Sequence, residues 1–135
     1  MEHMEKQKIL IVDDDRVISK VIKDGILAQK GEEYDVVTAF DGEEGLKAAE
    51  EHSPALILLD MVMPKVGGIE FLEQLRGNPK LAAIPVLIGT QVADIEQMSR
   101  AVELGVKGYI IKSEFSIENI VKQVEEVLAK EETGR

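Results

Sequence analysis

Four aspartates stand directly after apolar segments of this chain. Asp13, Asp14 and Asp15 follow the first apolar run, and Asp60 follows the third. Clustered carboxylates repel one another and raise each other's pKa unless a cation lies among them. Mg²⁺ suits such a cluster, because it keeps several waters and takes one or two carboxylates together with a phosphoryl oxygen. We therefore expect Mg²⁺ at Asp14 and Asp60, with Asp13 acting through water.

Two further polar residues follow later apolar runs. Thr90 comes after the fourth run and Lys112 after the fifth. An ammonium group supplies a point charge to a phosphoryl group, and a hydroxyl group can donate a hydrogen bond to it. Asp60 is the candidate carboxylate nucleophile. Together these residue types predict phosphoryl chemistry assisted by Mg²⁺.

The apolar runs themselves predict the strands that position these side chains. Each run is too short for a buried helix, and continuous apolarity is typical of a strand covered on both faces of a parallel sheet. Five βα units joined by right-handed crossovers predict an α/β fold, a doubly wound (βα)5 three-layer sandwich. Ligands in such sheets bind beyond the carboxyl ends of the strands. The runs lie at residues 9–12, 36–39, 56–59, 86–88 and 109–111.

The segments between the runs have helical spacing. The last helix is expected to begin after an N-cap at Ser116, and a shorter helix is expected after Asp41 and Gly42. The expected inward faces are Ile18, Val21, Ile22, Gly25 and Ile26, then Ile69, Leu72 and Leu75, then Ile95, Met98, Ala101 and Val102.

The composition indicates one acidic domain. The 135 residues include 16 Lys+Arg and 26 Asp+Glu, a net charge of −10, and no cysteine. This length suits a single domain at 8–130, with frayed ends at 1–7 and 131–135. The negative charge opposes direct binding to nucleic acid or anionic lipid, and no apolar run approaches the ~18 residues of a membrane span. We expect a cytoplasmic protein without disulfides or cysteine-based metal sites.

Taken together, these motifs resemble the response-regulator receiver domain of bacterial two-component signalling, in particular the chemotaxis-type receivers. The resemblance extends from Lys8 to about Ala129, and the order and spacing of the motifs make it specific. It implies a flavodoxin-like fold with a five-stranded parallel sheet in the order 2-1-3-4-5. The motifs are ILIVDD ending at Asp14, LLDMVMP around Asp60, Gly67-Gly68, Thr90 and GYIIK ending at Lys112.

The resemblance also implies roles for the residues around the acceptor. Asp60 resembles the phosphoacceptor, which takes a phosphoryl group from a histidine kinase or a histidine phosphotransfer protein. Asp14, Asp60 and the backbone carbonyl of Val62 resemble the direct Mg²⁺ ligands, and Asp13 resembles an outer-shell ligand. The resemblance thus implies that this site takes part in phosphorelay signal transduction. It also implies that the site loses its phosphoryl group slowly by autodephosphorylation.

The remaining implied roles concern switching. Thr90 and Lys112 resemble the contacts to the phosphoryl group, and Tyr109 resembles an aromatic that swings inward on activation. Phosphorylation would then bias an existing equilibrium toward partner binding. The sequence does not identify the downstream output protein. We expect the chain to be a monomer or a weak phosphorylation-dependent dimer.

The sequence departs from the common family pattern at several positions. Ser113 stands where proline usually follows the lysine, so the Lys112–Ser113 bond is left open as cis or trans. Val62 and Val92 are apolar where polar residues often orient the hydrolytic water, which predicts slow loss of the phosphoryl group. The Gln91 amide either covers the site or replaces the missing polar contact.

Other interpretations of the same residues are less specific. The three consecutive aspartates could cap a helix, although one suffices. Lys112 could be a solvated lysine, and Tyr109 could be a half-buried core aromatic. Asp60 could also be a plain turn residue.

Three other functions compete with a phosphoacceptor. Asp13, Asp15 and Val17 match the nucleophile motif of haloacid-dehalogenase-type hydrolases, but no aspartate occurs after Asp94 to complete that site. A dinucleotide carrier lacks its G-x-G-x-x-G motif here. An interaction-only receiver would not need the complete acidic and basic set. Metal-dependent labelling would distinguish it.

Overall fold

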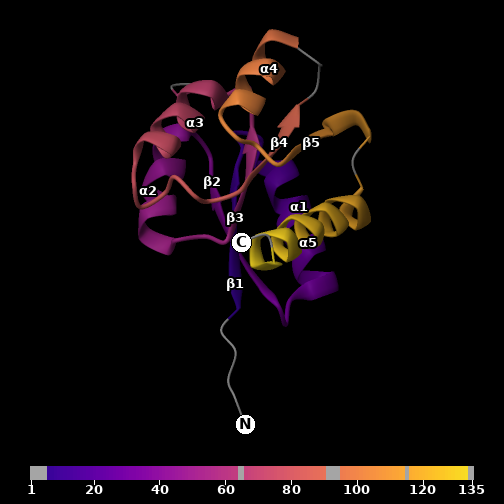
Figure 1. Ribbon diagram of the computed structural model, residues 1–135. Coiled ribbons are helices and arrows are strands. Elements are labelled where there is room, and N and C mark those ends of the chain that lie inside the picture. Colours follow the sequence, from indigo (N-terminus) through magenta and orange to yellow (C-terminus); the bar gives the residue numbers. More distant parts are fainter. Residues whose placement is uncertain (1–5, 64–65, 91–94, 115, 134–135) are drawn as a thin grey trace.

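The strands of this protein form one parallel sheet. The computed structural model describes residues 6–63, 66–90, 95–114 and 116–133. Within them the strand order is β2-β1-β3-β4-β5, and every pairing is parallel (Figure 1). The predicted doubly wound, flavodoxin-like order is therefore confirmed. The strands are β1 (Gln7–Val12), β2 (Tyr34–Ala39), β3 (Leu56–Asp60), β4 (Val86–Thr90) and β5 (Gly108–Ile111).

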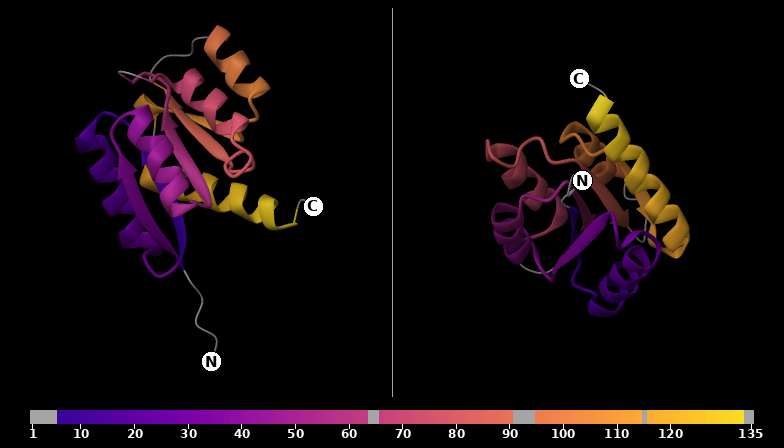
Figure 2. Two further views of the ribbon diagram at one scale, coloured as in Figure 1. Left: turned by 90° about the vertical axis from the view of Figure 1, so that its left-hand side faces the viewer. Right: turned by 90° about the horizontal axis from the view of Figure 1, so that it is seen from below.

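Helices cover both faces of the sheet. Helices α1 and α5 pack on one face, and α2, α3 and α4 pack on the other (Figures 1 and 2). The C-terminal turns of α5 project beyond the layers (Figure 2). The helices are α1 (Arg16–Lys30), α2 (Gly42–His52), α3 (Gly68–Gly77), α4 (Ile95–Glu103) and α5 (Ile117–Thr133), and a short 3₁₀ turn spans Lys112–Glu114.

The central strands explain the continuous apolar runs. Successive strand residues point to opposite faces, so a strand covered on both sides must be apolar at every position. In β1, Ile9 and Ile11 join the core beneath α1 and α5, whereas Leu10 and Val12 join the core beneath the other three helices. The sheet is thus held between two apolar cores, and polar groups are left to its rim.

Polar side chains define where helices begin. The Asp15 carboxylate accepts the N–H groups of Val17 and Ile18 at 3.0 Å each, and so caps α1. The Ser116 hydroxyl accepts the N–H of Asn119 at 3.1 Å, which confirms the N-cap predicted for α5. Such caps satisfy N–H groups that have no partner within the helix.

The elements reach further than the expected domain limits. Residue 7 belongs to β1 and residues 131–133 belong to α5. A salt bridge of 3.3 Å between Lys107 and Glu131 joins the last turns of α5 to the segment before β5. Among the described helices, none has the length and apolarity needed to cross a bilayer.

Two predicted inward positions are wrong. Val21 of α1 and Val102 of α4 are 48% and 65% exposed. In α1 the inward stripe runs through Ser19, Ile22 and Ile26, of which Ile22 is only partly buried. Successive helix residues lie about 100° apart, so Val21, next to Ile22, lies outside this stripe.

Candidate functional site

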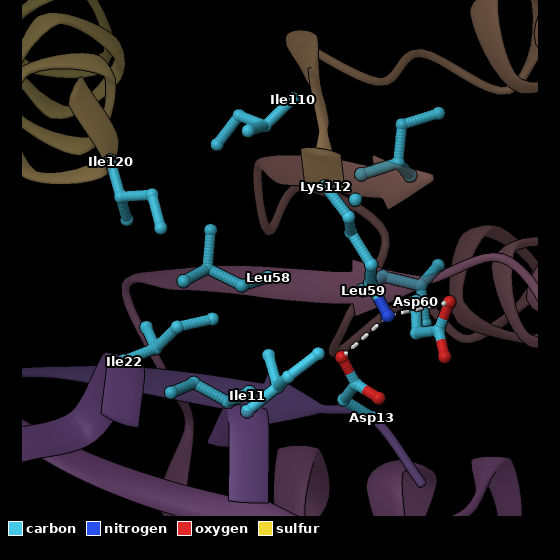
Figure 3. Close-up of a pocket in the computed structure, with 12 residues that line it drawn as sticks. Ile11, Asp13, Ile22, Leu58, Leu59, Asp60, Ile110, Lys112 and Ile120 are labelled. Atoms are coloured by element: carbon cyan, nitrogen blue, oxygen red, sulfur yellow. Dashed lines mark ion pairs between the residues drawn. The ribbon is translucent and has the colours of Figure 1, made fainter. Parts of the chain in front are cut away.

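Charged side chains from three strand ends meet at one rim of the sheet. Asp13 follows β1, Asp60 ends β3, and Lys112 follows β5 (Figure 3). The carboxylate residues are only 4% and 7% exposed, and the lysine side chain is 14% exposed. Because charged residues are rarely this buried unless they are paired, the three must be considered together.

Lys112 links the two buried carboxylates. Its Nζ lies 2.9 Å from Asp13 Oδ2 and 3.3 Å from Asp60 Oδ1 (Figure 3). Burial lowers the pKa of Lys112, but the hydrogen bond and charge of Asp13, together with those of Asp60, outweigh burial and leave the pKa raised. The interpretation of Lys112 as a solvated lysine is wrong.

Asp60 carries charge that its surroundings compensate only in part. Burial and the negative charge of Asp13 raise the pKa of Asp60, whereas Lys112 and the backbone N–H of Val62 lower it, and the result is about 6. That N–H donates to Asp60 Oδ1 at 3.2 Å. The carboxylate therefore gains from any further positive charge brought close to it.

The three consecutive aspartates have different environments. Asp15 caps α1, Asp13 is buried and accepts the N–H of Asp15 at 2.9 Å, and Asp14 is exposed. Helix capping therefore uses one aspartate of the three. Carboxylate oxygens of Asp13, Asp14 and Asp60 all lie within 4.8 Å of one another. Such a set of hard oxygen donors, with one ammonium against three carboxylates, fits a divalent cation of the Mg²⁺ type.

The segment after β5 also answers the question about Ser113. The described part of the chain contains no cis peptide bond, so the Lys112–Ser113 bond is trans. Both residues belong to the 3₁₀ turn that precedes α5. Lys112 reaches both carboxylates from this trans geometry.

The proposed switch residues are only partly described. Tyr109 is 53% exposed and belongs to neither apolar core, although about half of its side chain is covered, as the alternative of a half-buried aromatic expects. The backbone of Thr90 pairs with Ile111 at the end of β4, but its side chain lies outside the described part of the structure. The switch roles of Thr90 and Tyr109 stay predictions.

The residues expected to slow dephosphorylation are also partly described. The Val62 side chain is 72% exposed immediately after the acceptor strand. Gln91 and Val92 lie outside the described residues. Val62 thus adds an apolar, solvent-facing group near Asp60, and the effect on water stays a prediction.

One polar residue of the site escaped the sequence-based prediction. Ser19 is 1% exposed, and its hydroxyl donates to the main-chain carbonyl of Asp13 at 3.4 Å. Helical spacing could have predicted the burial of Ser19. It precedes Ile22 and Ile26 by three and seven residues and so shares their inward stripe. This bond helps to hold the strand end that carries Asp13.

An apolar cavity of about 40 Å³ lies behind the charged groups. Figure 3 shows its wall of Ile11, Leu58, Ile110 and Ile120, with the lysine and the carboxylates at one end. Apolar surroundings lower the local dielectric and strengthen the attraction between the ammonium and the carboxylates. The same surroundings raise the free energy of an uncompensated charge.

Comparisons with known proteins agree with this geometry. The pattern of the response regulator receiver domain matches residues 9–125. The alkaline phosphatase synthesis regulator PhoP of Bacillus subtilis is 38% identical over 126 residues, which are 93% of this chain and 50% of PhoP. A probable chemotaxis protein CheY of Rhizobium etli is 36% identical over 127 residues, 94% of this chain and 96% of that protein.

A solved structure extends the likeness to three dimensions. The CheY-like receiver domain protein of Methanospirillum hungatei superposes with a TM-score of 0.88 at 26% identity, over 97% of this chain and all of that one. The chain spans about half the length of PhoP and nearly all of the CheY relative. With the family pattern matched over most of its length, the chain belongs to the response regulator receiver domain family.

Proposed function

We propose that Asp60 accepts a phosphoryl group from a histidine kinase or a histidine phosphotransfer protein and that this modification switches a partner-binding surface. The observation that carries the proposal is the pair of buried carboxylates, Asp13 and Asp60, that share one ammonium group. A site in which negative charge exceeds positive charge is suited to a cation and to the chemistry that the cation assists.

The transfer would use Asp60 as the nucleophile. One of its carboxylate oxygens forms the new bond to phosphorus while the bond between phosphorus and the donor's histidine nitrogen breaks, and the electron pair of that bond stays on the nitrogen. Lys112 would follow the developing charge on the phosphoryl oxygens, since its ammonium already lies 3.3 Å from Asp60. The Thr90 hydroxyl would donate a second contact.

Asp14, Asp60 and the Val62 carbonyl would hold Mg²⁺, with Asp13 in the outer shell. The bound ion supplies neutralisation of the charge that builds up on the phosphoryl group. The exposure of Asp14 suits an ion that retains water, because solvent reaches this side of the carboxylate cluster. The buried Asp13, already bonded to Lys112 and to the N–H of Asp15, suits the outer-shell role.

The switch would begin when the acyl phosphate forms. A dianion at Asp60 attracts the Thr90 hydroxyl and the Lys112 ammonium, and Tyr109 moves inward from its exposed position. The surface of α4, β5 and α5 then changes its preference between partners, as a shift of a pre-existing equilibrium. The names of the relatives, a transcriptional regulatory protein and a chemotaxis protein, support such a signalling role. We place this role in the cytoplasm as part of the proposal.

A labelling experiment tests the proposal. The chain is incubated with acetyl phosphate and Mg²⁺, and intact-mass spectrometry follows the addition of one phosphoryl group. Wild type should be labelled and Asp60→Asn should not, because the amide removes the nucleophile and preserves the shape of the side chain. The label should be lost when Mg²⁺ is chelated before incubation. Labelling that persists in Asp60→Asn would move the acceptor to another residue.

An interaction-only receiver is the main alternative. It predicts no label in wild type and no effect of beryllofluoride, an analogue of the bound phosphoryl group, on partner capture. A pull-down from the source cell with and without beryllofluoride therefore separates the two functions and identifies the output protein. A hydrolase of the haloacid-dehalogenase type predicts turnover of phosphorylated small molecules and an acceptor at Asp13.

A further inference from the structure

The loop between β3 and α3 touches the start of α2 at a position where only glycine fits. A Cβ atom on Gly42 would lie 2.6 Å from Val66 Cβ and 2.6 Å from the Val66 carbonyl oxygen. Real Cβ atoms essentially never approach other atoms closer than 3.0 Å. We infer that Gly42 is a positioning residue for this loop, and thereby for the ligands that the loop and Asp60 offer to Mg²⁺. The inference rests on the proposed function.

The two ends of this loop are tightly defined. At its start, the Val62 N–H donates to Asp60 Oδ1 at 3.2 Å. At its end, the Gly68 N–H donates to the Met61 carbonyl at 3.2 Å, and a Cβ on Gly68 would lie 2.7 Å from Met61 Cα. The loop therefore closes on itself beside the acceptor. Between these ends, Val66 lies against Gly42 at the start of α2.

An alanine at position 42 would displace the loop more readily than the helix. The start of α2 is held by its cap, because Asp41 accepts the Glu44 N–H at 2.8 Å and the Glu44 carboxylate accepts the Phe40 N–H at 3.0 Å. Gly42 itself is buried. One of the three close atoms of Val66 is its main-chain carbonyl oxygen, so a change of side-chain rotamer cannot relieve the contact. The main chain at Val66 would have to shift.

The chain offers a matched control in the same loop. A Cβ on Gly67 would meet no atom within 4 Å. Glycine-to-alanine substitution at either position restricts the unfolded chain alike. Gly67 is the N-cap of α3, so Gly67→Ala also shows how much a weaker cap alone contributes without a steric contact. A difference between Gly42→Ala and Gly67→Ala therefore reports the contact with Val66.

The test measures Mg²⁺ affinity by calorimetric titration of the full chain, together with amide hydrogen exchange at residues 61–68. Gly42→Ala should weaken Mg²⁺ binding by roughly tenfold, the size of effect expected when support for a metal ligand is lost. It should also speed amide exchange in the loop. Gly67→Ala should change neither quantity. Equal Mg²⁺ affinity in wild type and Gly42→Ala would overturn the inference.

A second-site variant separates positioning from general destabilisation. Val66→Gly removes the Cβ and Cγ1 atoms that would collide with the new methyl group and leaves the carbonyl oxygen, so it should relieve the contact in part. Val66 is also a partly buried apolar residue, so this change should lower the melting temperature by itself. Gly42→Ala/Val66→Gly should nevertheless bind Mg²⁺ more tightly than Gly42→Ala. An affinity that instead falls with melting temperature across the variants would make Gly42 a plain packing residue and overturn the inference.

Two further outcomes are distinct. If Gly42→Ala does not fold and Val66→Gly does not restore it, Gly42 acts through the core and the inference is overturned. If wild type itself binds no Mg²⁺, the proposed function is overturned and this inference falls with it. Wild-type binding with unchanged affinity in Gly42→Ala overturns this inference alone.

Discussion

Buried charged groups at the two ends of the sheet have different kinds of partners. Near the amino ends of β4 and β5, the half-buried Arg76 guanidinium donates to four main-chain carbonyls of the described residues. Near the carboxyl ends of β1 and β3, Asp13 and Asp60 share one ammonium. The carbonyl partners of Arg76 are Leu104 at 2.7 Å, Ile84 at 2.8 Å, Ala82 at 3.0 Å and Gly105 at 3.4 Å.

The difference shows which end is complete without a ligand. Burial lowers the pKa of Arg76, yet its N–H groups are matched by oxygens that belong to the fold. Burial and the negative charge of Asp13 raise the pKa of Asp60, and the single ammonium of Lys112 offsets them only in part. The arginine therefore stabilises the native state, whereas the carboxylates cost stability until a cation arrives. Such a cost is typical of sites kept for function.

The largest expected effect comes from a substitution of Arg76, at the end of the sheet that is complete without a ligand. Arg76→Met should lower the free energy of unfolding by about 2–3 kcal/mol, since several hydrogen bonds to a charged group are lost at once. Urea denaturation measures this loss. Arg100→Met is the control, because Arg100 is 46% exposed in its ion pairs with Glu73 and Glu103 and its loss should destabilise the fold much less. Similar losses in both variants would refute a special role for Arg76.

A gain in the free energy of unfolding is expected at the carboxyl ends of the strands, where Asp60 lies. In metal-free protein at pH 7, Asp60→Asn should raise the free energy of unfolding by on the order of 2 kcal/mol, because the folded pKa of Asp60 is raised from 3.8 to about 6. Between pH 3.8 and about 6, the Asp60 carboxyl keeps its proton in the folded state, whereas it has lost that proton in the unfolded state. The contribution of Asp60 to stability is therefore complete below pH 4 and falls as the pH rises to about 6.

Urea titrations of both proteins in a chelator from pH 4 to 7 measure this difference. The two stabilities should converge near pH 4 and separate toward pH 7. A constant difference across the range would show that charge burial at Asp60 is not its cause.

A smaller effect is expected when Mg²⁺ binds beside Asp13 and Asp60, where it would offset the excess negative charge. Mg²⁺ at about ten times its dissociation constant should raise the free energy of unfolding of wild type by about 1.4 kcal/mol. Asp14→Ala should abolish most of this gain, because the exposed oxygen ligand is lost, whereas Arg76→Met should retain it. Thermal melts with and without Mg²⁺ provide the comparison. An undiminished response in Asp14→Ala would contradict its assignment as a ligand.

The smallest expected effect concerns the lifetime of the phosphoryl group. Val62→Asn should speed its hydrolysis by roughly threefold, about 0.6 kcal/mol of barrier, because the amide can orient a water that valine cannot. Decay of the label at fixed Mg²⁺ measures the rate. Val17→Asn controls for the loss of an exposed valine elsewhere near the rim, since Val17 is 73% exposed on α1. Equal acceleration in both variants would argue against water positioning by residue 62.

Much of the fold could be predicted from local pattern. The apolar runs and helical stripes determined the order of the elements, because burial on both faces of a strand and on one face of a helix leaves a periodic record in the sequence. The same reasoning placed Asp13, Asp60 and Lys112 at one rim, since each follows a strand. The strand order itself came from the family resemblance.

Only the tertiary structure decided how these side chains divide their roles. Three adjacent aspartates are alike in sequence, yet Asp13 is buried against Lys112, Asp14 faces solvent and Asp15 caps α1. The contact between Gly42 and Val66 likewise joins residues that no periodic pattern relates. Periodicity reports which face of an element is covered, whereas distances between side chains on different elements depend on how the layers pack.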